Sequence, residues 1–231
     1  MAYTYIGLCN QVLRALNEVE FSGETDFNSA VGFHAHTKDF INYTLAHIYS
    51  EEDNRWPFQV TTGSVTLLTD GTVDYSLNAT AAVIDWDSFY LDYDVALDSP
   101  EYKKLRRVPY DYYKNYHRVN DLNLTVSTSY GKPDFIARNY DNTVSVSPPA
   151  NAAYTMKYYY WARLTKLSAH GDVPIIPETY EKVIVDGALA RAYKFRDNIE
   201  QGSAADEDFM RGINTMRRNL IPQPVSMIVV D

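Results

Sequence analysis

The spacing of hydrophobic residues changes twice along this chain of 231 residues, and the change limits the folds open to it. Apolar residues recur with a helical period near both ends, whereas the middle consists of short β-prone segments cut by turns. A helix with one apolar face must bury that face, and the simplest partner for each terminal set of helices is the other. The sequence therefore predicts an α+β protein, in which an α-helical bundle from the N- and C-terminal helices carries a tyrosine-rich antiparallel β insert.

The points where the spacing changes divide the chain into four segments. We expect a helical domain made of residues 1–56 and 166–220, a β-rich insert over 57–165, and an extended C-terminal arm over 221–231. Fourteen of the twenty tyrosines fall between Tyr75 and Tyr160. Large amphipathic rings at this density are typical of a small sheet whose faces they partly cover.

Composition narrows the class of protein. The single cysteine, Cys9, allows no internal disulfide, and its place on an apolar helical stripe predicts a buried side chain. The N-terminus lacks the pattern of a signal peptide, and no apolar run approaches about 18 residues, so we expect a protein used without export and without a membrane. A net charge of −9 argues against broad affinity for nucleic-acid phosphates. An acidic surface could still face DNA if its role were to let the DNA pass without binding it.

The N-terminal part contains two expected helices. The first has Thr4 as its N-cap and ends before a loop over Asn17–Asp26, and the second runs from about Asn28 to Ser50. Its stripe contains Phe33, Thr37, Phe40, Ile41, Thr44, Leu45 and Ile48.

The expected elements of the insert follow turn signals. They are a hairpin of Phe58–Leu68 and Val73–Leu77, strands over Ala82–Tyr93 and Tyr102–Val108, a short helix after Pro109, a second hairpin of Asp134–Tyr140 and Thr143–Ser147, and a strand over Ala153–Ala162.

The helical period returns at Pro177, a favourable first helical residue. Small residues around Gly187 would let a neighbouring helix approach closely, so we interpret this glycine as a packing residue. Ser203 is the expected cap of the last helix, which Pro222 and Pro224 terminate.

No residue set has the spacing of a metal or cofactor site. His34 and His36 lie on one expected helix but point about 200° apart around its axis, so they cannot chelate one ion. Phosphate-binding glycine loops, nucleophile elbows and zinc-finger spacings are absent from the sequence.

Two carbohydrate functions remain as alternatives. Asp85 and Asp87 share one face of an expected strand and could supply the carboxylate pair of a glycan hydrolase. Exposed rings such as Trp86 or Trp161 could instead serve a carbohydrate-binding module. Solvation is the simpler explanation of the carboxylates, so we expect neither catalytic residues nor an enzyme.

The densest basic cluster is Lys103, Lys104, Arg106 and Arg107. On a strand these charges divide between two faces, which is typical of an edge protected against aggregation or of an interface. Few basic residues lie near them, so they are a weak nucleic-acid site.

The segment Val225–Val230 is short, apolar and β-prone. A free end of this kind favours aggregation unless something covers it. Two alternatives are open: the segment folds back on its own domain, or a partner takes it up at a sheet edge or in a groove.

Two stretches carry a resemblance to a known family. The stretch Leu8–Val19 (LCNQVLRALNEV), the strand-rich middle and the stretch Ile176–Tyr193 (IPETYEKVIVDGALARAY) resemble the head-to-tail adaptor proteins of tailed phages, the tail tubular protein A group. The resemblance covers nearly the whole chain. It implies a virion protein, assembled in the host cytoplasm, that forms a ring of typically twelve copies between the portal and the tail nozzle, through which the genome passes.

The resemblance also implies roles for particular residues. The portal-docking arm would comprise Leu220, Ile221, Val225, Met227, Ile228, Val229 and Val230. Contacts with neighbouring subunits or the tail nozzle would come from Tyr90, Tyr93, Tyr112, Tyr113 and Tyr116. Tyrosine suits such contacts, because it offers a large area with few rotors to freeze. No cofactor is implied, and DNA passes without specific binding.

Overall fold

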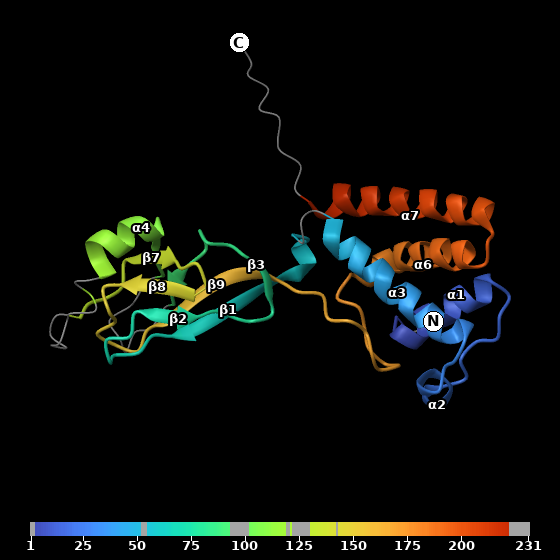
Figure 1. The fold of residues 1–231 in the computed structure, drawn as a ribbon, viewed down its shortest axis with the longest axis horizontal. Helices are drawn as coiled ribbons and strands as arrows, with labels where there is room; N and C mark the ends of the chain where they lie inside the picture. Colours follow the sequence, from blue (N-terminus) through green and yellow to red (C-terminus); the bar gives the residue numbers. More distant parts are fainter. Residues whose placement is uncertain are drawn as a thin grey trace, which may run out of the picture. The chain divides into compact units, whose positions relative to one another are not determined.

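The computed structural model describes residues 3–51, 55–92, 102–118, 121, 130–141 and 143–221 (Figure 1). The chain divides into two compact units. The helical unit comprises Met1–Gln59 and Leu164–Asp231, and the β unit comprises Val60–Arg163. The predicted α+β class is confirmed. The expected arm beyond residue 221 and the expected contact residue Tyr93 lie outside the described residues.

The helical unit is built from helices of both chain ends. They are α1 (Tyr5–Ala15), α2 (Glu24–Asn28), α3 (Phe33–Ser50), α6 (Glu181–Phe195) and α7 (Ile199–Leu220), with 3-10 turns at Pro57–Gln59 and Glu178–Tyr180. Helix α6 packs against α1, α3 and α7, so it ties the two chain ends together. The largest fully buried side chains here are those of Tyr5, Leu8, Leu13, Phe27, Ile41, Leu45, Ile48, Trp56 and Phe209.

Capping residues set the helix ends. Thr4 caps α1 as predicted, since its hydroxyl accepts a hydrogen bond from the amide of Gly7 at 3.3 Å. The prediction that Ser203 caps the last helix is wrong. Helix α7 begins at Ile199, because the Asn198 side chain accepts from the amide of Gln201 at 3.2 Å.

The expected second helix, from about Asn28 to Ser50, is α3, which starts later than predicted and is preceded by the short helix α2. Helix α2 ends at Asn28 and α3 starts at Phe33, and between them Gly32 has a φ of 56°. Glycine adopts this left-handed conformation without steric cost, so the chain can turn here. The predicted loop over Asn17–Asp26 correspondingly ends in the first turn of α2.

Cys9 is buried in the helical unit, as its place on the apolar stripe predicted. Burial raises the pKa of its thiol to about 12, so the thiolate is scarce at neutral pH.

Gly187 confirms the interpretation of a packing glycine. A Cβ atom on this residue would lie 2.5 Å from Cγ2 of Thr44 on α3 and 2.7 Å from Cδ2 of Phe209 on α7. The absence of a side chain therefore lets three helices meet at one point.

Replacing Gly187 by alanine is expected to lower the free energy of unfolding by about 1 kcal/mol. Overpacking a core costs about 1–3 kcal/mol, and the gain in helix propensity returns about 1 kcal/mol of this. The matched control is Gly202→Ala in α7, where the nearest side-chain atom is Cγ of the flexible Lys194 at 3.1 Å. Denaturant unfolding should show the control unchanged or stabilised. Equal effects of the two substitutions would contradict the packing account.

In the part of the β unit that the structure describes there are nine strands. They are β1 (Val60–Thr66), β2 (Asp74–Ser76), β3 (Ala81–Ile84), β4 (Tyr90–Leu91), β5 (Lys103–Lys104), β6 (Arg106–Val108), β7 (Phe135–Arg138), β8 (Thr143–Ser147) and β9 (Thr155–Ala162). One sheet has the order β1-β9-β4-β5, with β3 also paired to β9, and the other has the order β2-β8-β7-β6. Residues of both sheets form one apolar cluster, which includes Leu67, Tyr75, Phe89, Leu91, Ile136, Val144, Val146, Met156 and Tyr158.

The first predicted hairpin is wrong. Strand β1 pairs with β9, and β2 pairs with β8 in the other sheet. The side chain of Tyr75 explains part of this separation. Its hydroxyl accepts from the amide of Leu68 at 3.0 Å and donates to the carbonyl of Thr72 at 2.9 Å, so it holds the connection in a loop.

The second predicted hairpin is confirmed, because Phe135 pairs with Ser147 and Arg138 with Val144. Other parts of the insert differ from expectation. The predicted strand 82–93 is interrupted between β3 and β4, and the predicted strand 102–108 is split between the two sheets as β5 and β6. Strand β6 also runs parallel to β7, so the insert is not wholly antiparallel. Such breaks follow from tertiary pairing, which a single strand's composition does not encode.

Candidate interaction surfaces

The β unit exposes tyrosine rings in two groups. The first, here the Tyr90 surface, consists of Tyr90, Tyr102 and Tyr159. The ring of Tyr90 lies 5.6 Å from that of Tyr102, edge to face, and 6.3 Å from that of Tyr159. Tyr102 is 68% exposed, and Tyr159 is also exposed. Burial, and then the hydrogen bond with Tyr159, raises the pKa of Tyr90 above its usual range.

The second group, here the Tyr112 surface, consists of Tyr110, Tyr112, Tyr116 and Tyr140. Helix α4 (Tyr110–Tyr113) and the following π-helical turn (Lys114–Arg118) carry three of these rings. Tyr112 lies 4.8 Å from Tyr116, and Tyr110 lies 5.2 Å from Tyr140 in the β7–β8 turn. Exposure reaches 64% for Tyr116 and 86% for Tyr140. Exposed aromatic clusters of this kind are typical of protein contacts.

Tyr113 differs from its neighbours on the same helix. Its side chain is fully buried, and its ring stacks on His117 at 6.4 Å. The expectation that Tyr113 contacts a partner therefore needs correction, because a ring beneath the helix presents no surface to a second molecule. Helical geometry explains the difference, since consecutive residues point about 100° apart.

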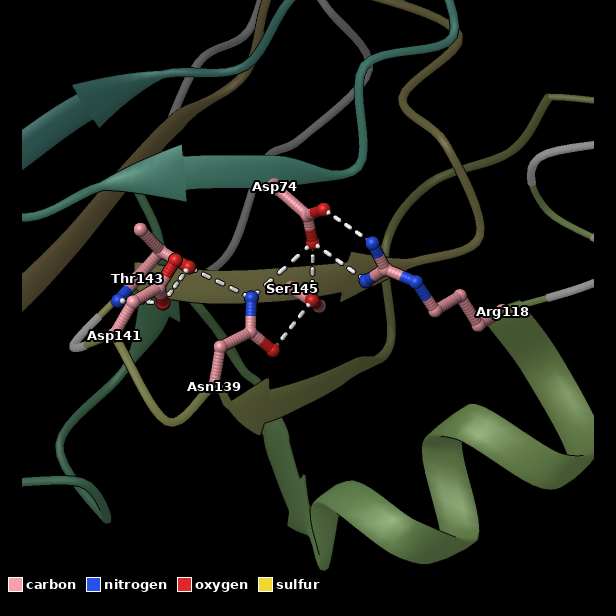
Figure 2. A network of polar contacts seen from close by, with 6 residues as sticks. All are labelled: Asp74, Arg118, Asn139, Asp141, Thr143 and Ser145. Atoms are coloured by element: carbon pink, nitrogen blue, oxygen red, sulfur yellow. Dashed lines mark hydrogen bonds and ion pairs between the residues drawn. The ribbon is translucent and has the colours of Figure 1, made fainter.

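A polar network fixes the Tyr112 surface to the sheet beneath it (Figure 2). The guanidinium of Arg118, at the end of the helical segment, donates two hydrogen bonds to the carboxylate of Asp74 on β2, at 2.9 and 3.1 Å. The same carboxylate accepts from Asn139 at 3.3 Å and from the hydroxyl of Ser145. A bidentate arginine contact holds its partner in one geometry, so the position of the helix is determined by the sheet.

The β7–β8 turn extends this network. Asn139 donates to the hydroxyl of Thr143 at 2.7 Å, and Asp141 accepts from the amide and hydroxyl of Thr143 at 3.0 and 2.6 Å (Figure 2). This turn carries Tyr140. The network therefore anchors both the helical segment and the turn that form the Tyr112 surface. The sequence did not point to Asp74, since Arg118 lies 44 residues away. Asp141, two residues before Thr143, is by contrast a turn signal that can be recognised in the sequence.

Replacing Asp74 by asparagine is expected to destabilise the β unit by about 1–2 kcal/mol, because charge-assisted hydrogen bonds at a partly exposed site are lost. Burial raises the pKa of Asp74, but hydrogen bonds from Arg118, Ser145 and Asn139 hold it below its usual range. A lowered folded-state pKa stabilises the protein above the unfolded pKa of about 3.9. This stability is lost as the pH falls through the folded pKa.

Denaturant unfolding of Asp74→Asn and the parent at pH 7 and below pH 4 measures this effect. The difference between them should shrink at the lower pH. Asp87→Asn, at an exposed residue, is the control and should change stability by less than about 0.5 kcal/mol. If the difference in free energy of unfolding between the parent and Asp74→Asn stays constant with pH, the charge of Asp74 is not the source of the lost stability.

The basic cluster is partly neutralised within the β unit. Lys103 and Arg106 both form ion pairs with Asp134, the former at 3.2 Å. The hydrogen bond from Arg106 lowers the pKa of Asp134, and Lys103 lowers it further. Lys104 and Arg107 are exposed on the edge strands β5 and β6. This arrangement fits a protected edge or an interface better than a nucleic-acid site.

The residues of the carbohydrate alternatives have local structural contacts. The Asp85 carboxylate accepts from the amide of Asp87 at 3.1 Å, which closes a turn between β3 and β4. The ring of Trp86 stacks on Phe89 at 5.5 Å, and the guanidinium of Arg138 lies 5.2 Å from its centre. Trp86 is therefore engaged within the β unit.

Among the described residues, no three His, Cys, Asp or Glu side chains gather in a way that could hold a metal ion. His34 instead contacts the carbonyl of Val19 at 2.8 Å, and His36 packs 4.8 Å from the ring of Phe195. Within the same part of the chain, no helix is both long and apolar enough to cross a membrane.

The last described residues close the helical unit. Leu220 and Ile221 are half-buried and pack against the helical core. Near them Arg217 donates to the carboxylate of Glu51 at 3.0 Å, which joins the end of α7 to the end of α3. A docking arm would therefore start beyond Ile221 rather than at Leu220.

The sequence model of the SU10 adaptor protein family matches residues 3–227, which is nearly the whole chain. The chain therefore belongs to the SU10 adaptor protein family. Membership makes it a phage adaptor, a structural protein of the virion that works through contacts with other proteins. No curated protein matches the chain.

Proposed function

We propose that this protein is a head-to-tail adaptor of the tail tubular protein A type. Copies of the chain, typically twelve in this type, would form a ring between the portal and the tail nozzle through which DNA passes. The observation that carries this proposal is the family match over residues 3–227. The ring has no enzymatic role in this proposal, and its contacts come from its surfaces and its C-terminal arm.

The two tyrosine surfaces support this assignment. A ring requires heterologous contacts, in which two different surfaces of the same chain meet. The β unit offers the Tyr90 surface and the Tyr112 surface, which contain different residues and different elements. We assign Tyr90, Tyr112 and Tyr116 to contacts with neighbouring copies or the tail nozzle. The proposal drops Tyr113, because its ring is buried.

Charge distribution supports the passage of DNA. The helical unit carries 18 Asp and Glu against 11 Lys and Arg, whereas the β unit carries 12 against 10. Repulsion between acidic side chains and phosphates prevents the genome from binding to the wall of a channel. We propose that acidic side chains of the helical unit face the channel.

The arm is proposed to dock onto the portal through Val225, Met227, Ile228, Val229 and Val230. Deleting Val225–Asp231 should abolish portal binding. The fold should be unchanged, because all the core residues of the helical unit that the structure describes precede residue 222. Binding is measured by co-sedimentation with purified portal, and circular dichroism checks the fold. A deletion variant that still binds would refute this docking role.

The whole assignment is tested by negative-stain images of the protein mixed with its portal. Rings stacked on one end of the portal are expected. Particles that never associate with the portal, at concentrations where both proteins are folded, would overturn the assignment.

A further inference from the structure

Among the described residues, strand β1 is the outermost strand of its sheet, and its outer edge lacks the protection that natural sheet edges usually have. It is seven residues long, and its sequence VTTGSVT contains neither a charged residue nor a proline. A long, uncharged edge strand is a template for another strand, which proteins normally blunt with charge, proline, bulges or short length. The other outer strands follow that rule. Strands β5 and β6 carry Lys or Arg, β2 has three residues, and β3 is bulged.

The register between β1 and β9 shows which backbone groups of β1 face outward. Thr66 pairs with Thr155, and the amide of Leu67 donates to the carbonyl of Tyr154 at 2.8 Å. In an antiparallel ladder the groups of alternate residues point to opposite sides. Leu67, Val65, Gly63 and Thr61 therefore face β9, whereas Thr66, Ser64, Thr62 and Val60 face away. Within the described ranges, no backbone hydrogen bond joins these outward groups to another element.

We propose that this edge accepts a strand, and that the strand is the segment Val225–Val230 of a second copy. The segment has six consecutive residues without charge or proline, four of them Val or Ile, which matches the length and character of β1. Each copy has one such segment and one such edge. Contacts between different surfaces of identical copies are heterologous, and they form a closed ring where the rotation between neighbours closes.

This inference rests on the proposed ring, and it gives the arm a partner before the portal is present. A β-prone apolar end favours aggregation when it is uncovered, and so does an unprotected edge. Pairing them covers both. The portal then replaces β1 of the neighbouring copy as the partner of the arm.

Amide hydrogen exchange of the full-length protein tests the proposal. Thr62, Ser64 and Thr66 should be protected, and in an Ile228→Asp/Val229→Asp variant their exchange should accelerate at least about tenfold. Gly63 and Val65 should keep their protection in both proteins, because their amides face β9. Val173→Asp, at an exposed residue of the helical unit, is the control and should change neither group.

The concentration dependence identifies the occupant. Protection that rises with protein concentration supports a second copy. Protection independent of concentration would assign the edge to the same copy's own arm, and protection only after portal is added would assign it to the portal. Either result, or outward amides that exchange at the same rate in the parent and the arm variant, overturns the proposal.

Mixing two variants gives a second test. The arm variant keeps its edge, and Ser64→Pro removes an outward donor while leaving the ladder to β9. If the Ser64→Pro variant does not fold, Ser64→Lys is used in its place, because it puts a charge on the same edge. Each variant alone lacks one half of the pair, so the mixture should associate more strongly than either variant, through one-to-one pairs, by analytical ultracentrifugation. No association in the mixture would refute the pairing, and the portal images test the ring proposal separately.

Discussion

Replacing Trp56 by alanine is expected to lower the free energy of unfolding of the helical unit by about 3–5 kcal/mol, the largest effect of any single substitution considered. Its side chain is fully buried, and the indole Nε1 donates to the carbonyl of Ile48 at 2.6 Å. The ring also stacks on Phe58 at 5.6 Å. Alanine would leave a cavity and an unpaired carbonyl near the end of α3.

A graded series separates the two contributions at Trp56. Trp56→Phe keeps an aromatic ring but loses the hydrogen bond. Its free energy of unfolding should therefore lie between that of the parent and that of the alanine variant. Urea unfolding followed by circular dichroism at 222 nm measures the helical unit without depending on the tryptophan itself. A loss below about 1 kcal/mol for Trp56→Ala would show that the side chain does not anchor the core.

Replacing Gly63 by alanine is expected to destabilise the β unit by about 3 kcal/mol, at the upper end for overpacking. Gly63 on β1 lies opposite Tyr158 on β9, and a Cβ atom would lie 2.3 Å from Cζ of the Tyr158 ring. This ring cannot easily move away. It stacks on Phe89 at 4.9 Å, and its hydroxyl accepts from the amide of Asn78 at 2.8 Å.

A double-mutant cycle identifies the source of that loss. In a Tyr158→Leu background the clash is gone, so Gly63→Ala should then cost less than about 1 kcal/mol. The matched control is Thr62→Ala, one residue earlier on the exposed side of β1. Denaturant unfolding with near-ultraviolet dichroism follows the packed tyrosines of the β unit. A similar cost of Gly63→Ala in both backgrounds would exclude the contact with Tyr158 as its cause.

Local patterns predicted those parts of the fold that local interactions decide. The N-cap Thr4, the β7–β8 hairpin and the packing role of Gly187 all follow from residue type and spacing within a few turns. The wrong first hairpin shows where this approach ends. The chain does bend between Leu68 and Val73, yet the residues of β1 pair with residues of β9 that lie 89 to 101 positions further along the chain. Pairing at that distance depends on the whole core.

The same limit of local patterns applies to the candidate surfaces. Tyrosine density predicted an aromatic surface, but which rings point outward depends on how the helix sits on the sheet. The Asp74–Arg118 contact determines that position, and no local pattern marks it. The buried Tyr113 and the exposed Tyr112, adjacent in sequence, could be distinguished only after the helix was placed.

The pairing of β1 with β9 has a mechanical consequence. The chain leaves the helical unit at Gln59 and re-enters it at Leu164, and Val60 pairs with Trp161 at the same end of the two strands. A pull between the units therefore acts on two covalent strands side by side. Because both strands are loaded in the same direction, tension does not slide one past the other, and their mutual hydrogen bonds carry little of the load. The register between β1 and β9 is therefore not strained by such a pull.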